Sequence, residues 1–251
     1  MNYFNLIAMA VPTDGTGFTF WLGAMAMMAA SVFFFLSMNS VDAKWRTSLL
    51  VSGLITFIAA VHYMYMRDAH AAGDSTTVFR YVDWILTVPL MCVEFYLILR
   101  VAGATKSHMW KLIGFSTIML VTGFFGESGW DGPKTVTDGV TTYGEGILSP
   151  QIWGLFSGLA YFYIAYEVWL GSLKKLAVAA GGNVLKAHKT LCWFLLVGWA
   201  IYPLGYMAGT DGWYNGIENV LPSMEVIYNI GDAINKIGFG LVVYTLAVSK
   251  D

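Results

Sequence analysis

The sequence predicts an all-α membrane protein in which seven transmembrane helices form one bundle. Of its 251 residues, 57% are hydrophobic and only 12% are charged, whereas ordinary soluble domains carry about 25% charged residues. Seven apolar runs have about the 20 residues that a helix needs to cross a bilayer. The loops between these runs also alternate in charge. Length, hydropathy and charge therefore agree on the same fold class.

The spans are expected, in chain order, at roughly 18–38, 47–66, 78–99, 109–126, 151–171, 190–209 and 224–248. The residues before the first span lack the basic region of a secretory signal, so we expect a short, partly apolar segment outside that span. The longest loop, at about 127–149, is rich in Gly and Thr and could form a small hairpin. No linker or internal repeat divides the sequence, so one domain is expected over residues 1–251.

Loop charge predicts which side of the membrane each loop faces. The loops after spans one, three and five carry basic residues: Lys44 and Arg46; Arg100, Lys106 and Lys111; Lys174, Lys175, Lys186 and Lys189. The alternate loops are mainly acidic. Because cytoplasmic loops are enriched in Lys and Arg, we expect the N-terminus outside and the C-terminus in the cytoplasm.

Other classes of protein are disfavoured by the same composition. The net charge of -2 and the lack of a basic patch argue against nucleic-acid binding, and no metal site is expected. Cys92 and Cys192 both fall inside expected spans. We expect them to be unpaired packing residues, with a disulfide between them as the alternative.

The third span, FRYVDWILTVPLMCVEFYLILR, carries ionisable residues at membrane depth, where they are costly and usually functional. At 100° per residue, Arg80, Asp83, Thr87 and Glu94 fall within an arc of about 60°, with Asp83 and Glu94 about 16 Å apart along the helix. Such a polar stripe fits a proton route. The alternative is a structural network that holds helices together.

The seventh span contains an aspartate and a lysine one helical turn apart. Asp232 and Lys236 stand at positions i and i+4, on one helix face. Lys236 is the only one of ten lysines in the middle of a span. A buried amine is a competent Schiff-base nucleophile. A plain buried Lys–Asp ion pair is the alternative interpretation.

Aromatic residues and a proline gather in the sixth span, GWAIYPLGY. Trp199, Tyr202 and Tyr206 lie near one face, and Pro203 is expected to kink the helix because it lacks a backbone donor. Trp84 and Tyr63 add ring surface from other spans. Such rings are usually membrane core, but beside a buried lysine they could wall a long, flat polyene.

Two further ionisable residues are His62, which joins the buried set, and Glu167, which is expected simply to reach the cytoplasmic interface.

The segments RYVDWILTVPLMCVEFYLIL, HYMYMR, GWAIYPLGY and DAINKIGFGL resemble the microbial rhodopsins, most closely the proteorhodopsin and xanthorhodopsin group. The resemblance extends through all seven spans. It implies all-trans retinal bound covalently to Lys236 as a protonated Schiff base, and isomerisation driven by light. It also implies a multi-pass protein of the bacterial inner membrane and a homo-oligomer, since pentamers or hexamers occur among relatives.

The resemblance assigns roles residue by residue. Asp83 resembles the primary counter-ion and proton acceptor, Asp232 the second counter-ion, and Glu94 the cytoplasmic donor. Arg80 resembles the extracellular gate, Thr87 a hydrogen-bonding partner near Asp83, and His62 the histidine coupled to the acceptor. The retinal-pocket walls match Trp84, Trp199, Tyr202 and Pro203, and Met91 occupies the colour-tuning position. A matched pair of extracellular release carboxylates is not evident, and Glu218 and Glu225 are the candidates.

Gly154 permits two interpretations. Xanthorhodopsin-like proteins have Gly at this position, where a carotenoid antenna rests against an opening beside the retinal ring. The expected carotenoid would be hydroxylated, with polar ends that reach both interfaces. Alternatively, Gly154 and Gly158 form a GxxxG helix-packing motif.

The sequence thus favours an outward, light-driven proton pump, an ion transporter rather than an enzyme. An acceptor and a donor carboxylate on one helix face are what directional proton transfer requires. A chloride pump would have a neutral residue at position 83, and a sodium pump would have Asn at 83 and Gln at 94. The main alternative is a photosensory rhodopsin that signals to a partner protein, although such proteins commonly lack the carboxylate at position 94. A purely structural membrane protein is the remote alternative.

Overall fold

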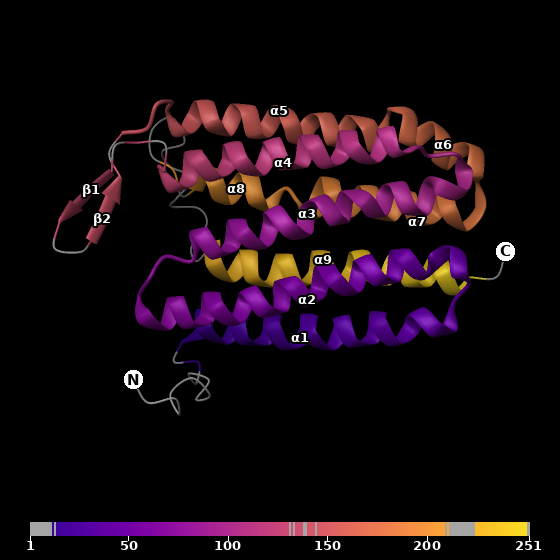
Figure 1. The fold of residues 1–251 in the computed structure, drawn as a ribbon, viewed down its shortest axis with the longest axis horizontal. Coiled ribbons are helices and arrows are strands. Elements are labelled where there is room, and N and C mark those ends of the chain that lie inside the picture. The colour runs from indigo at the N-terminus through magenta and orange to yellow at the C-terminus, as the bar shows by residue number, and fades with distance from the viewer. Residues whose placement is uncertain are drawn as a thin grey trace.

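The computed structural model describes residues 14–130, 145–208 and 224–249, together with Pro12, Gly132, Thr210 and two short strands. Its helices lie side by side as one bundle (Figure 1). The helices are α1 (Gly15–Ser37), α2 (Ala43–Ala72), α3 (Thr77–Leu99), α4 (Lys106–Ser128), α5 (Pro150–Trp169), α6 (Ser172–Ala180), α7 (Gly182–Trp193), α8 (Ile201–Ala208) and α9 (Met224–Val248).

The prediction of seven spans is confirmed. Six helical segments in the described part of the chain are long and apolar enough to cross a membrane. The remaining span is α5, whose 20 residues reach about 30 Å, the thickness of a hydrocarbon core. Several helices continue past the predicted limits, because a helix does not end where its lipid-facing surface ends. Helix α2, for example, runs on through Arg67 to Ala72.

The predicted hairpin is also present. Strands β1 (Lys134–Thr137) and β2 (Val140–Tyr143) pair antiparallel, with Lys134 opposite Tyr143. The hairpin projects from the end of the bundle where α1 begins, and α9 finishes at the opposite end (Figure 1). We call the first the hairpin end, which loop charge assigns to the outside, and the second the cytoplasmic end.

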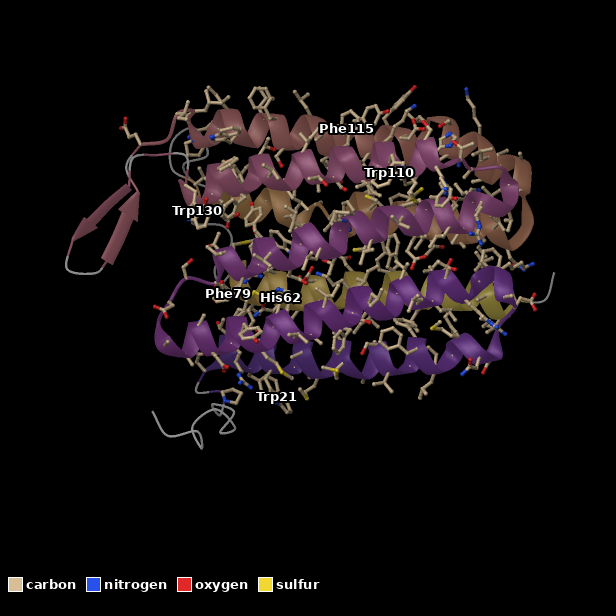
Figure 2. All side chains as sticks on the ribbon, viewed as in Figure 1. Trp21, His62, Phe79, Trp110, Phe115 and Trp130 are labelled. Atoms are coloured by element: carbon tan, nitrogen blue, oxygen red, sulfur yellow. The ribbon has the colours of Figure 1, made fainter. Side chains whose placement is uncertain are left out.

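The bundle is polar at its centre and apolar on its outer surface. The mid-span ionisable side chains of α3 and α9 (Arg80, Asp83, Glu94, Asp232 and Lys236) are almost fully buried, whereas large apolar residues such as Leu36, Phe162 and Val197 are exposed, as suits a surface that faces lipid. Trp110 and Trp130, both exposed, mark the two ends of α4 (Figure 2), and tryptophan is enriched at membrane interfaces. Cys92 and Cys192 are buried and free, as expected.

The sixth span is interrupted by a π-helical turn at Phe194–Gly198, between α7 and α8. Within it, the amide of Trp199 donates to the carbonyl of Phe194 at 3.1 Å, five residues back. The Tyr161 hydroxyl donates to the Leu195 carbonyl at 3.2 Å, and Asn235 Nδ2 donates to the Gly198 carbonyl at 2.9 Å. The sequence predicted an interruption at Pro203. In the structure it begins earlier, at Phe194.

Candidate functional site

The site is centred on Lys236 of α9, which lies between two aspartates. Its Nζ is 3.1 Å from Oδ2 of Asp83 on α3 and 2.5 Å from Oδ2 of Asp232, one turn earlier on α9. All three side chains are at most 2% exposed. Buried charges are tolerated when they are paired at close range, so the helices hold a cation and two carboxylates in one compact group.

The two carboxylates differ in the donors around them. Asp232 accepts hydrogen bonds from Tyr63 at 3.0 Å and from Tyr202 at 2.7 Å, in addition to its contact with Lys236. Asp83 contacts Lys236 through Oδ2, while its buried Oδ1 has no hydrogen-bond partner among the described residues. A carboxylate can accept about four hydrogen bonds, so Asp83 keeps free acceptor capacity beside the amine.

On the hairpin side of Asp83, Arg80 is buried among aromatic rings. Its guanidinium carbon lies 4.8 Å from the centre of the Tyr228 ring. Nη2 is 3.5 Å from the Thr76 hydroxyl and 3.8 Å from Oε1 of Glu225, whereas Nη1 has no hydrogen-bond partner in the described structure. Arg80 therefore contacts Glu225, one of the two exit carboxylates that the sequence suggested. The other, Glu218, lies outside the described residues.

On the cytoplasmic side, Glu94 is fully buried on the same helix as Asp83. It accepts one hydrogen bond, from Ser52 on α2, at 2.7 Å through Oε1. Its second oxygen has no partner within the described segments. Helix α3 runs without a break from Thr77 to Leu99, so the polar stripe predicted from the sequence keeps its helical spacing.

The structure places three further predicted residues. Thr87 hydrogen-bonds to Asp83, as expected, but it donates to the main-chain carbonyl at 2.9 Å, because a helical threonine readily bonds the carbonyl four residues back. His62 lies in the half of α2 nearer the hairpin end (Figure 2), with Nδ1 2.9 Å from the Ile58 carbonyl, and it can act on Asp83 only through space. Glu167, near the cytoplasmic end of α5, is buried within the protein and accepts a hydrogen bond from Ser172.

An apolar cavity of about 520 Å³ adjoins this group of charges. Its walls include six residues predicted for the pocket: Trp84, Gly154, Trp199, Tyr202, Pro203 and Tyr206. Tyr202 both lines the cavity and donates to Asp232, so the cavity and the ion pairs share a wall. The other three predicted cofactor-binding residues are not among its walls: Met91 is buried on α3, Tyr63 bonds to Asp232, and Lys236 contacts Asp83 and Asp232.

The cavity reaches the outer surface between α5 and α8. Leu155, Leu159 and Phe162 line it and are also exposed. A Cβ atom added at Gly158 would meet no atom of a neighbouring segment within 4 Å. Within the chain, this part of the GxxxG motif therefore packs against nothing, which argues against the helix-packing interpretation.

Sequence reasoning missed several partners in the site. Ser52, Asn235 and Tyr228 are single polar or aromatic residues in apolar spans, and nothing in their spacing connects them to the ionisable residues. Glu127 falls at the start of the loop expected at about 127–149, but it accepts from the Tyr81 hydroxyl at 2.7 Å. A polar residue on the inward face of a span was the only available signal.

The fold and the buried lysine define a class of protein: the chain belongs to the bacteriorhodopsin-like protein family, whose model matches residues 14–250. It is 42% identical over 241 residues to the green-light absorbing proteorhodopsin of Gamma-proteobacterium EBAC31A08, covering 95% of this chain and 88% of that protein. The resemblance inferred from the sequence is thereby confirmed.

Solved structures agree. The blue light-absorbing proteorhodopsin from Med12 superposes with a TM-score of 0.72 at 39% identity, covering 93% of this chain and 98% of that one. Xanthorhodopsin, described as a light-driven ion pump with dual chromophore, superposes with a TM-score of 0.74 at 27% identity, covering 92% of each chain.

Proposed function

We propose that this protein is a light-driven proton pump that moves protons outward and carries retinal on Lys236. One observation carries the proposal: Nζ of Lys236 lies 3.1 Å from Asp83, and Glu94 stands on the same helix toward the cytoplasm. The proteorhodopsin and xanthorhodopsin relatives support it. The predicted inner-membrane location and the pentamer or hexamer belong to the same proposal.

The residues present suit a retinal group. The amine of Lys236 contacts Asp232, and Tyr202, which donates to Asp232, lines an apolar cavity of about 520 Å³. That volume is within the usual range for ligand pockets, and flat rings from Trp84 and Trp199 also line the cavity. Joined to Nζ of Lys236, retinal would supply light absorption and an isomerisation that changes the orientation of that nitrogen.

The side chains then divide the proton transfer between them. Asp83 receives the proton from Nζ, since its carboxylate is within hydrogen-bonding distance and keeps a free oxygen. Asp232 serves as the second counter-ion, positioned by the hydrogen bonds that Tyr63 and Tyr202 donate to its carboxylate. Glu94 returns a proton to Nζ from the cytoplasmic side. The order Glu94, Asp83, Arg80 along α3 supports the outward direction.

The test begins with cells that express the full chain and are supplied with retinal. We expect coloured membranes, borohydride trapping of the label on Lys236, and acidification of the medium on illumination that a protonophore abolishes. Lys236→Ala is the control and should remain colourless. Labelling of another residue would overturn the assignment of Lys236, and colour without acidification would favour the photosensory alternative.

We also propose that the opening beside Gly154 accepts a hydroxylated carotenoid as an antenna. The exposed edge of the cavity, the empty space at Gly158 and the dual chromophore of xanthorhodopsin support this proposal.

A further inference from the structure

A row of titratable side chains leads from Arg80 to the surface at the hairpin end. Glu225 at the start of α9 accepts from Thr76 through Oε1 at 2.6 Å, and its Oε2 lies 3.5 Å from Nδ1 of His70 on α2. Nε2 of the same imidazole lies 3.0 Å from Oδ2 of Asp14, just before α1. Three helices thus contribute to one continuous row.

The two ends of this row differ in exposure. The side chain of Arg80 is 3% exposed and that of Asp14 54%, while Glu225 and His70 between them are 36% and 26% exposed. The row therefore begins in the closed interior and finishes in contact with water. At its inner end, the buried Nη1 of Arg80 has no partner among the described residues, so the guanidinium can change partners without breaking another hydrogen bond.

We propose that His70 relays the outgoing proton from Glu225 to Asp14, which delivers it to the outer surface. The proposal rests on the pumping function proposed above. An imidazole suits this task because one ring nitrogen can accept a proton while the other gives one up. Here each nitrogen faces a different carboxylate.

The transfer balances as follows. A proton on Oε2 of Glu225 moves to Nδ1 of His70, and the proton on Nε2 moves to Oδ2 of Asp14 and then to water. The imidazole is left neutral in its other tautomer and recovers the first by exchange with water, to which it is partly exposed. The 3.5 Å separation at Nδ1 requires a small approach of the two side chains or one bridging water.

Asp14 is well placed as the last group. Its Oδ1 accepts from the amide of Gly17 at 2.6 Å, which fixes the carboxylate whatever His70 does. The hydrogen bonds from Gly17 and His70 hold the pKa of Asp14 below its ordinary value, so a proton that reaches it passes on to water. The charged groups facing His70 are Asp14 and Glu225, with Arg80 beyond Glu225. Arg67 of the same helix is engaged with Asp68.

A rival exit would lead from Arg80 past Tyr81 to Glu127. The Tyr81 hydroxyl donates to Glu127 at 2.7 Å, but among the described residues no hydrogen bond carries that pair on to a further carboxylate or imidazole. The Glu225 branch reaches a water-exposed acid through contacts of at most 3.5 Å.

The experiment uses the full retinal-loaded chain in nanodiscs. A flash starts the cycle; absorbance follows proton loss at Lys236, and a surface-bound pH dye follows proton arrival outside. In His70→Gln we expect proton loss at Lys236 to keep its rate, and arrival outside to slow on the order of a hundredfold, as for loss of a positioned proton-transfer group. Millimolar imidazole in the medium should restore fast arrival.

Further variants separate a relay from a structural link. Asp14→Asn keeps an oxygen for the helix cap and should also delay arrival, whereas Asp68→Asn removes a nearby surface carboxylate and should not. Fast arrival in His70→Gln, or a delay that imidazole does not relieve, would overturn the relay while leaving the pump intact. If the unmodified chain neither loses the proton at Lys236 nor acidifies the medium, the proposed function itself fails.

Discussion

Glu94 combines complete burial with a single hydrogen bond, from Ser52. As a donor it must hold a proton before the flash, and Gln cannot supply one. We therefore expect Glu94→Gln to leave the first proton loss at Lys236 unchanged and to slow proton return by roughly a hundredfold. Ser52→Ala, which keeps the carboxyl, should slow it less. Flash absorbance measures both steps, and normal proton return in Glu94→Gln would mean that another group is the donor.

Asp83 should behave as both acceptor and counter-ion. Asp83→Asn removes a negative charge 3.1 Å from Nζ. That charge stabilises the ground state of a bound chromophore cation more than its excited state, so its removal narrows the energy gap between the two states. We expect a red-shifted pigment that no longer acidifies the medium. Thr87→Val is the matched control: Thr87 bonds only the Asp83 main chain, so colour and pumping should change little. Sustained pumping by Asp83→Asn would remove Asp83 from the proton path.

For individual residues, the sequence predicted the chemistry of the site better than it predicted the contacts between helices. Helical spacing alone placed Asp83 and Glu94 on one face and Asp232 one turn from Lys236, because both pairs lie within single helices. Contacts between helices depend on rotation and depth, which a periodic pattern does not encode. For that reason the bonds from Ser52 to Glu94 and from Tyr63 to Asp232 appeared only in the structure.

Among the elements, α1 depends on Asp14 for its cap and for its link to α2 through His70. Because the folded-state pKa of Asp14 lies below the ordinary value of 3.8, its stabilising contribution is present above that value and is lost as pH falls through the folded-state pKa. The unmodified chain should therefore have a higher melting temperature than Asp14→Asn near neutral pH, and this difference should shrink at acidic pH. A difference that stays constant from neutral pH to about pH 2 would contradict this sign.

Element types were predictable where apolar runs were long, and less so elsewhere. The seven spans follow from hydropathy. Helix α6 lies in a basic loop and has only nine residues, far fewer than the roughly 20 by which spans were recognised, so it was not predicted. The sixth span reads as one apolar run, and its π-helical turn depends on hydrogen bonds from Tyr161 and Asn235, which belong to distant segments.

For the whole molecule, the opening between α5 and α8 decides whether a second pigment can approach. If a hydroxylated carotenoid rests there, the excitation spectrum of pumping should gain carotenoid bands, and Gly154→Trp should remove them by filling the opening. Gly114→Trp is the control, because Gly114 is exposed on α4, does not line the cavity and has no atom within 4 Å of an added Cβ. Bands that never appear with a broad panel of carotenoids would leave Gly154 as a packing glycine.

The wide turn at Phe194–Gly198 also bears on how the length of this chain can vary. A π-helical turn holds one residue more than an α-helical turn, so losing one residue there would restore a regular helix and keep Trp199 and Tyr202 facing as they do. The same loss between Asp83 and Glu94 would rotate everything beyond it by about 100° and take the donor off the acceptor's face. The sixth span is thus a place where a single-residue deletion is compatible with the fold, whereas α3 has a length fixed by the residues that it aligns.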